Sequence, residues 1–327
     1  MRAAWYERQG APEDVLQVGS LDVPEPAAGE VRVRIHASGV NRSDTYGRSG
    51  RQAPMAFARI IPHQDGSGVV DAVGQGVPTD RVGQRVWVYE ATWNRPGGSA
   101  AEYTVVPARR AIRLPDGIDF DAGACLGIPA MTAHRAVFAD ESVTGQTVLV
   151  TGGAGAVGSA AIQLACWGGA RVLATVSSGA KAQVARDAGA DETINYRTED
   201  VVDAIKRLTD GGGVDRIVDV DFGGNLSTTI QALKPDGVVA SYATRGDPEP
   251  KIPFRSLMVK NLTVRAILVY TMSEAAKTAA SQDITRTLES GALRPVIGQR
   301  LRLDDIAQAH TDVERGSVVG NTVLQLA

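Results

Sequence analysis

The chain has 327 residues, 43% of them hydrophobic and 22% charged, so it can bury a sizeable core and has the length of two domains. Its formal net charge of −3 gives no electrostatic basis for binding a nucleic acid, and its N-terminus has no apolar run that would indicate a signal peptide. Its two cysteines, Cys125 and Cys166, are too far apart for a metal or redox motif, and such unpaired thiols are typical of a cytoplasmic protein.

Short alternating or β-rich runs fill the first third of the chain. The runs 31–40, 66–74 and 84–89 are separated by proline and glycine turns, which predicts an antiparallel, barrel-like domain. From about residue 121, strand-like and helical segments alternate through residue 196, which predicts one half of a doubly wound parallel sheet. The uncharged stretch 142–170 contains too many glycine, threonine and glutamine residues for a membrane helix.

A second set of alternating segments, from residue 201 to 270, predicts the other half of the sheet. Its strands are nearly continuous apolar runs, as expected for parallel strands that are buried on both faces. The segments after residue 270 resemble neither half and are expected to complete the first domain. We therefore predict an α/β protein in which residues 125–269 form the parallel-sheet domain and residues 1–124 and 270–327 form the β-rich domain.

A glycine-rich loop follows the strand-like run 147–150. Its glycines spell G-x-G-x-x-G between a strand and a helix, which is the context that a dinucleotide-binding loop requires. The first glycine is expected to permit the tight turn, the second to let the backbone approach a pyrophosphate, and the third to let helix and strand pack closely. Free N–H groups at the helix N-terminus would bind the pyrophosphate. The predicted cofactor ligands here are Gly153, Ala154, Gly155, Ala156, Val157 and Gly158.

The end of the next strand-like run, 170–176, selects the dinucleotide. An NAD enzyme places a carboxylate there, on the ribose 2′-hydroxyl, whereas this chain continues with Ser177, Ser178 and Gly179. Hydroxyl groups and the ammonium of Lys181 would accept a 2′-phosphate that a carboxylate would repel, which favours NADPH. The alternative is that Lys181 is only an exposed helix residue.

Five further segments are distinctive in this order: GVNRSDTYGRSG at 39–50, DGSGVVDAVG at 65–74, GSAAEY at 98–103, PAMTA at 129–133 and GADETINY at 189–196. Together they resemble the quinone oxidoreductases, a zinc-free branch of the medium-chain dehydrogenases/reductases. The similarity extends from the first residue to the last. It implies a GroES-like β-rich barrel as the catalytic domain, a Rossmann domain for the cofactor, and a homodimer formed through the strand 261–270.

The resemblance also implies roles for individual residues. Asn41 would lie beside the nicotinamide, Tyr46 would face the substrate, and Thr132 would line the nicotinamide end of the site. The chain would pass the nicotinamide ring at Tyr242 and Ala243. Ser177, Lys181 and Tyr196 would hold the 2′-phosphate. Family members often have a second tyrosine shortly after the first, but this chain reads Arg51-Gln52-Ala53-Pro54, which leaves the substrate class open.

The positions of a possible zinc site are altered in this chain. Zinc-dependent relatives bind the metal with a cysteine, a histidine in a Gly-His-Glu motif and a later cysteine or acid. Here the first position is Asn41 and the motif reads His63-Gln64-Asp65, so the histidine is displaced by one residue. On an extended segment, that displacement turns the side chain to the opposite face. We therefore predict no metal site.

Oxidation of an alcohol needs a Lewis acid to stabilise the alkoxide, and no metal site is predicted here. Reduction of an acceptor that takes up a hydride readily is therefore favoured. We predict NADPH-dependent reduction of a quinone, with Asn41 and Tyr46 as catalytic residues and Tyr46 donating a hydrogen bond to the carbonyl oxygen. The alternatives are a reductase of 2-enoyl thioesters or alkenals, and an NADPH-binding sensor or nucleic-acid-binding protein without turnover. Asp44 is either a proton relay or a local cap of the turn at residues 41–46.

Overall fold

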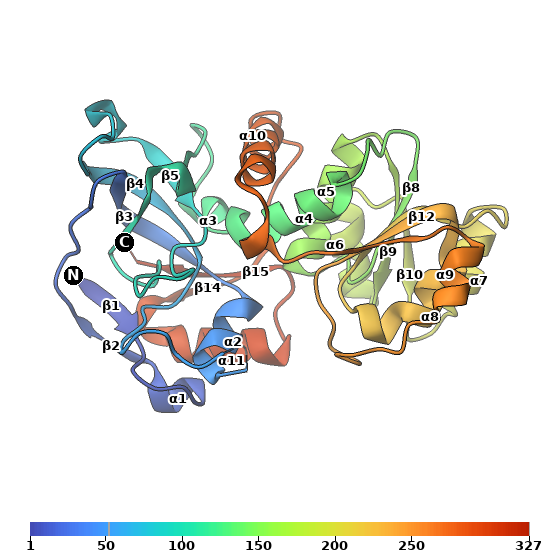
Figure 1. The fold of residues 1–327 in the computed structure, drawn as a ribbon, viewed down its shortest axis with the longest axis horizontal. Helices are drawn as coiled ribbons and strands as arrows, with labels where there is room; N and C mark the ends of the chain where they lie inside the picture. Colours follow the sequence, from blue (N-terminus) through green and yellow to red (C-terminus); the bar gives the residue numbers. More distant parts are fainter. Residues whose placement is uncertain (52, 327) are drawn as a thin grey trace. The chain divides into compact units, whose positions relative to one another are not determined.

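The computed structural model describes residues 1–51 and 53–326, so Gln52 and Ala327 lie outside the described ranges (Figure 1). Contacts between Cα atoms divide the chain into unit 1, residues 1–129 and 295–327, and unit 2, residues 130–294. The β-rich unit therefore gains residues 125–129 and lacks 270–294 relative to the expected boundaries. Residues 270–294 belong to unit 2 because helix α10 (Glu274–Glu289) packs against α4 (Met131–Phe138), where His134 Nε2 lies 2.7 Å from Asp283 Oδ2.

Unit 1 is built on a seven-stranded, mainly antiparallel sheet, as predicted for the first domain. Its order is β14-β15-β3-β4-β5-β7, and β6 also pairs with β3. Inward-facing residues of β3, such as Val31, Val33 and Ile35, are fully or almost fully buried, because side chains alternate between the two faces of a strand. The strands are β3 (Glu30–Val40), β4 (Asp65–Val73), β5 (Arg85–Val88), β6 (Tyr103–Pro107), β7 (Ala111–Arg113), β14 (Ile297–Arg302) and β15 (Asn321–Gln325), with a separate pair β1 (Arg2–Trp5) and β2 (Gln17–Ser20).

The end of the chain completes unit 1, as expected from its sequence pattern. Strand β15 pairs with β3, so the last strand lies beside one formed almost 300 residues earlier (Figure 1). Helix α11 packs against α1 and α2. The helices of this unit are α1 (Pro12–Val15), α2 (Arg42–Ser49), α3 (Phe120–Gly123) and α11 (Ile306–Arg315), with 3₁₀ turns η1 (Thr79–Arg81), η2 (Ala108–Arg110) and η5 (Leu303–Asp305) and a π-helical turn η3 (Leu126–Ala130) that reaches the unit boundary.

Unit 2 is a doubly wound parallel sheet of the predicted kind. Its strand order β10-β9-β8-β11-β12-β13 places the first strand in the middle, and the order reverses between β8 and β11. Ligands of such sheets bind at the carboxyl ends of the strands near that reversal. The strands are β8 (Thr147–Val150), β9 (Arg171–Val176), β10 (Glu192–Asn195), β11 (Val214–Asp219), β12 (Leu233–Ser241) and β13 (Thr263–Ala266).

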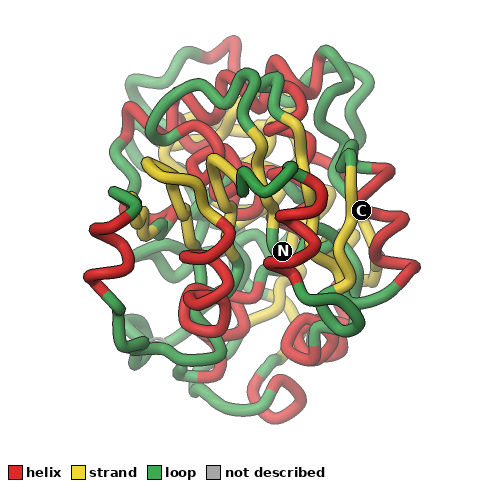
Figure 2. Tube along the Cα trace, turned by 90° about the vertical axis from the view of Figure 1, so that its right-hand side faces the viewer, coloured by secondary structure: helices red, strands yellow, loops and turns green. Residues whose placement is uncertain are grey.

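Helices cover both faces of the sheet in unit 2. Helix α5 packs against α4 and α6 on one face, and α7 packs against α8 on the other (Figure 1). The strands accordingly lie inside and the helices outside (Figure 2). These helices are α4, α5 (Ala156–Trp167), α6 (Gly179–Asp187), α7 (Val201–Leu208), α8 (Phe222–Ala232), α9 (Phe254–Val259) and α10, with the 3₁₀ turn η4 (Val269–Thr271). None of the helices within residues 1–51 and 53–326 has the length and apolar character that crossing a membrane requires.

Candidate active site

The glycine-rich loop lies between β8 and α5, in the predicted context. Gly155 caps α5, and Gly152 N–H and Gly153 N–H donate to the side chain and carbonyl of Thr175 on the neighbouring strand β9 at 3.1 and 3.0 Å. The free N–H groups of the first turn of α5 are therefore held at the carboxyl end of the sheet. That position suits a pyrophosphate, because helix N-termini carry partial positive charge.

The structural roles of the loop glycines differ in part from those expected from the motif. The left-handed backbone of the tight turn is at Gly152, with φ of 67°, rather than at Gly153. A Cβ on Gly153 would lie 2.9 Å from Ala174 Cβ, so this glycine serves close packing between loop and sheet. A Cβ on Gly158 would lie 2.3 Å from the Gly152 carbonyl oxygen, which confirms the close approach expected there. Gly155 has its nearest neighbour at 3.4 Å and leaves room beside the backbone.

The residues expected at the 2′-phosphate gather at one end of the sheet. Ser177 follows β9 and Tyr196 follows β10, and Tyr196 N–H donates to the carbonyl of Val176 at 3.1 Å. Lys181 lies in the first turn of α6, where its N–H donates to Ser178 Oγ at 3.3 Å. The end of β9 carries hydroxyls and no carboxylate.

A cavity of about 650 Å³ opens beside this loop, within unit 2. Its volume is in the usual range for small-molecule sites. One acid, Asp221, faces it, but the N–H groups of Arg245, Gly246 and Gly224 bind its carboxylate; although burial opposes them, they hold the pKa of Asp221 below its usual value. The lining includes Thr151, Gly152, Thr175, Tyr196, Asp221 and Arg245.

The residues expected near the nicotinamide lie at two further places in unit 2. Thr132 is a buried residue in the first turn of α4. Tyr242 and Ala243 directly follow β12, and Tyr242 N–H donates to the Asp219 carbonyl at 3.2 Å. Burial, with a smaller contribution from Asp219, raises the pKa of the Tyr242 phenol, so the phenol stays protonated at neutral pH.

In unit 1, Asn41 connects the end of β3 to the start of α2. Its Nδ2 donates to Asp65 Oδ2 at 2.8 Å, and the Ile128 N–H donates to the same oxygen at 2.8 Å. Asp65 is fully buried. Burial, together with the nearby charges of Asp44 and Glu90, raises its pKa well above the usual value. The hydrogen bonds from Ile128 and Asn41 oppose this rise.

Asp44 is a second buried carboxyl three residues along, and it caps α2. Its Oδ2 accepts the Asn41 backbone N–H at 2.7 Å, so the cap weighed from the sequence is present. Its other oxygen, Oδ1, is buried without a hydrogen-bond partner among the described residues. Burial raises the pKa of Asp44 to about 7, against the opposing effect of the N–H groups of Asn41 and Gln64.

Asp44 and Gln64 line a cavity of about 160 Å³ within unit 1. Gln64 stands where the zinc-dependent pattern has histidine, and its Oε1 is buried and unpartnered among the described residues. The remaining wall is largely apolar or aromatic, with Tyr6, Met55, Phe57, Ile60 and Trp93. The cavity thus has a largely apolar lining, and two buried oxygens of its polar residues, Asp44 Oδ1 and Gln64 Oε1, lack a hydrogen-bond partner among the described residues.

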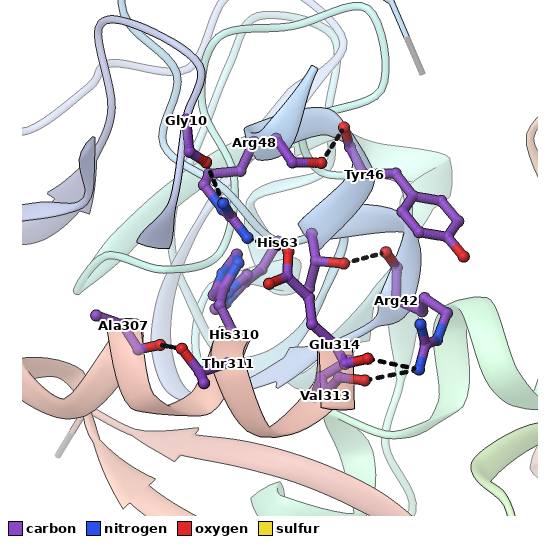
Figure 3. Close-up of polar contacts among 12 residues, drawn as sticks. Gly10, Arg42, Tyr46, Arg48, His63, Ala307, His310, Thr311, Val313 and Glu314 are labelled. Atoms are coloured by element: carbon purple, nitrogen blue, oxygen red, sulfur yellow. Dashed lines mark hydrogen bonds and ion pairs between the residues drawn. The ribbon is translucent and has the colours of Figure 1, made fainter. Parts of the chain in front are cut away.

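Tyr46 lies on α2 but is not among the residues that line this cavity. Its ring extends away from Arg48 and the two histidines (Figure 3). On the other side of α2, Arg48 is 1% exposed and pairs with Glu314 of α11. Arg42 of the same helix donates to the Val313 carbonyl at 2.9 Å. These contacts fix α2, and with it Asn41 and Asp44, to the end of the chain.

His63 is engaged with Ser38 and His310 through its side chain. Its backbone has φ of 77°, its Nδ1 lies 2.8 Å from Ser38 Oγ, and its Nε2 lies 3.0 Å from His310 Nε2 (Figure 3). The two histidines therefore form a buried pair. Burial lowers the pKa of His63 to about 3 and that of His310 well below its usual value, so both rings are neutral. Within the described residues, no group of three or more His, Cys, Asp or Glu side chains is arranged to hold a metal ion.

Comparison with known proteins places these features in a family. Residues 27–116 match the family model described as "Alcohol dehydrogenase GroES-like domain", and residues 156–285 match "Zinc-binding dehydrogenase". The human protein named "Quinone oxidoreductase" is 32% identical over 100% of this chain and 98% of its own length. The chain belongs to the quinone oxidoreductase family of the medium-chain dehydrogenases/reductases.

Other members of the wider superfamily are similar over the same length. A Burkholderia protein named "2-haloacrylate reductase" is 30% identical over 98% of both chains. The Escherichia coli quinone oxidoreductase solved in complex with NADPH is 27% identical, with a TM-score of 0.87 over 99% of this chain and 100% of that one. A structure titled "NAD-dependent alcohol dehydrogenase" is 32% identical, with a TM-score of 0.89 over both entire chains.

For this member of the quinone oxidoreductase family, motif comparison missed the residues that fix the site from a distance. Arg48 and Glu314 are 266 positions apart, and His63 and His310 are 247 apart. No local pattern joins such pairs. Gln64 could have been recognised as a candidate, because it occupies the place of the displaced histidine.

Proposed function

We propose that the protein is an NADPH-dependent reductase that transfers a hydride to a quinone without zinc. The observation that carries this proposal is the pairing of Asn41 with Asp65. Two N–H groups point at Asp65 Oδ2, where a bound metal would need a free lone pair, and burial raises the pKa of this carboxyl. A carboxyl that already accepts two hydrogen bonds and whose pKa is raised is a poor metal ligand, because metal ligands must be deprotonated.

The cofactor site is proposed on unit 2. NADPH, when bound, supplies the hydride. The N–H groups at Gly155–Gly158 would bind its pyrophosphate, and Ser177, Lys181 and Tyr196 would bind its 2′-phosphate. Asn41, Thr132 and the chain at Tyr242–Ala243 would orient the nicotinamide. Tyr46 would donate a hydrogen bond to an acceptor oxygen that lies outside the cavity of unit 1, which Tyr46 does not line.

A neutral acceptor fits the cavity of unit 1 better than a carboxylate-bearing one such as a 2-haloacrylate. Arg95 is the one arginine or lysine among the described residues that line the cavity, and it pairs with Glu30 at 2.7 Å. Asp44 adds a carboxyl rather than a cation. An anionic substrate would therefore find no unpaired positive charge there.

The test is oxidation of NADPH and of NADH by metal-stripped protein, with 1,4-benzoquinone, 9,10-phenanthrenequinone, an alkenal and 2-chloroacrylate as acceptors. We expect turnover of the quinones with NADPH, and a loss of about 100-fold in kcat for Tyr46→Phe. Activity that disappears with the metal would overturn the zinc-free mechanism. Turnover of the alkenal alone would favour the activated-alkene reductase, and NADPH binding without any turnover would favour a sensor.

We further propose that the protein forms a homodimer through the 261–270 segment. Strand β13 is the edge of its sheet, and the side chains of Val264 and Leu268 are 39% and 51% exposed. Phe254 and Met258 of α9 expose further apolar surface on unit 2. Sedimentation equilibrium should give twice the mass of the chain, and Val264→Lys should shift the protein toward the monomer. A wild-type monomer at all concentrations would contradict the proposal.

A further inference from the structure

The cavity of unit 1 contains one titratable group that is suited to exchange a proton with an occupant. Reduction of a quinone to a hydroquinone consumes one hydride and one proton, and the donor of the proton is not defined by the cofactor chemistry. Apart from Arg95, which pairs with Glu30, three ionisable side chains line the cavity, Tyr6, Asp44 and His63. A fourth, Asp65, interacts with Asp44. Their hydrogen bonds and burial differ enough to separate them.

Three of the four are unsuited to donate. Asp65 does not line the cavity, and its free oxygen Oδ1 faces Gly127, on which a Cβ would lie 2.0 Å from it. His63 lines the cavity, but both ring nitrogens are engaged, one with Ser38 and one with His310. For Tyr6, burial and then the Asp44 charge raise the pKa to about 12, against the opposing charge of Arg48, so its phenol keeps its proton.

Asp44 remains, and its geometry is that of a donor. Its Oδ2 is held by the Asn41 N–H, which fixes the direction of the carboxyl. Its Oδ1 makes no hydrogen bond of normal geometry among the described residues, although the Gln64 N–H acts on the carboxyl, and Asp44 is only 6% exposed and lines the cavity. A buried polar atom without a partner is costly unless the occupant of the cavity supplies one.

We propose that Asp44 is the proton donor of the reductase reaction, which rests on the function proposed above. The O–H bond of the Asp44 carboxyl breaks, and a new O–H bond forms on one carbonyl oxygen of the quinone. The hydride and its electron pair come from NADPH, which is oxidised to NADP⁺, so the product is the hydroquinone. Asp44 is left as a carboxylate and regains its proton from water that enters the cavity. Gln64 Oε1, also unpartnered, accepts a hydroxyl of the hydroquinone and positions it.

The decisive variant is Asp44→Asn. Its amide oxygen can still accept the Asn41 N–H, so the cap of α2 is kept while the proton is removed. The matched control is Asp305→Asn, because Asp305 occupies the equivalent capping position at η5, where it accepts the Arg302 N–H at 3.4 Å on the exposed surface. We expect Asp44→Asn to lower kcat for quinone reduction by about 100-fold and Asp305→Asn to leave it unchanged.

The pH profile distinguishes proton donation from a structural role. Wild-type kcat should fall by about tenfold per pH unit above about pH 7, where Asp44 is ionised. Asp44→Asn should lose this limb, and Asp44→Glu should restore it in part. NADPH binding, measured by fluorescence, should be unchanged in both variants, because the proposed cofactor loop lies in unit 2. A wild-type kcat and pH profile in Asp44→Asn would overturn the proposal.

A second readout does not depend on activity. In protein labelled with ¹³C at the aspartate carboxyls, one NMR resonance should titrate near pH 7 and be missing from both Asp44→Asn and Asp44→Glu. If the resonance that is missing from these variants titrates below about pH 5 in the wild type, Asp44 holds no proton at neutral pH and the proposal is wrong. If the wild type reduces no quinone but this titration is found, the proposed function fails while the proton on Asp44 stands.

Discussion

Arg48 of α2 and Glu314 of α11 form a buried ion pair, and substitution of Glu314 should lower the stability of the protein more than substitution of Arg48. Glu314→Gln leaves the Arg48 guanidinium, which is 1% exposed, with the Gly10 carbonyl and a neutral amide, and its Nε is already unpartnered among the described residues. An uncompensated buried charge costs about 3 kcal/mol. Arg48→Met removes that charge and keeps much of the volume, while Glu314, 30% exposed, can turn to water. We expect a cost of about 1 kcal/mol for this variant.

Urea unfolding followed by tryptophan fluorescence measures the difference, because three of the four tryptophans, Trp5, Trp87 and Trp93, lie in unit 1. The midpoint should shift with an unchanged slope, and Arg48→Met/Glu314→Gln should regain most of the stability that Glu314→Gln alone loses. Glu7→Gln is the control, since it breaks a pair with Arg59 in which both side chains are about half exposed, and should cost under about 1 kcal/mol. Equal losses in Glu314→Gln and Arg48→Met, or a loss in Glu314→Gln no greater than in the control, would refute this reasoning.

Three further predictions concern the cofactor loop, the choice of dinucleotide and the buried histidines. Gly158→Ala should lose about 2 kcal/mol of stability, because its Cβ would meet a backbone oxygen at 2.3 Å. Gly155→Ala should unfold like the wild type but bind NADPH more weakly. Thermal unfolding and NADPH titration distinguish the two effects. Ser177→Asp should weaken NADPH binding at least about tenfold without weakening NADH binding, since it places a carboxylate at the 2′-phosphate; equal losses for both cofactors would contradict the assignment. Because the folded protein lowers the pKa values of His63 and His310, the unfolded chain binds more protons than the folded chain as the pH falls through about 6.5. The free energy of unfolding should therefore fall by about 2 kcal/mol per histidine by about pH 5. His310→Gln should make this decline in the free energy of unfolding at acidic pH less steep. An unchanged decline would show that the pKa values of the two histidines are not lowered in the folded protein.

Local patterns were sufficient to predict the elements and the class of fold. The alternation of apolar runs with helical segments defines β8 to β12, and strict alternation defines β3, because each pattern depends on neighbours within one element. The domain boundary near residue 270 was placed too early, since nothing in the pattern of 273–291 shows that α10 packs against α4. That contact depends on His134 and Asp283, which are 149 positions apart.

The loop chemistry was predicted in kind but not in detail. The G-x-G-x-x-G spacing located the loop, yet the left-handed residue is Gly152, one position before the motif. The motif spacing shows which positions need glycine, whereas the φ angles and the nearest atoms in the structure show the reason at each position. Similarly, the displacement of His63 by one residue can be seen in the sequence, but its contact with His310, near the far end of the chain, cannot.

The buried carboxyl of Asp44 should lower stability at the same pH at which it is proposed to act. Its folded pKa of about 7 lies above the unfolded value near 3.8, so folding binds a proton between these values. The contribution of the protonated Asp44 carboxyl to the free energy of unfolding is therefore complete below about pH 3.8. It is lost as the pH rises through about 7, by up to about 4 kcal/mol. Asp44→Asn cannot ionise and should show a correspondingly flatter decline in the free energy of unfolding from about pH 4 to 8, while losing turnover. Parallel declines in the wild type and Asp44→Asn would mean that the carboxyl is solvated in the folded protein, and its burial would then explain neither stability nor proton transfer.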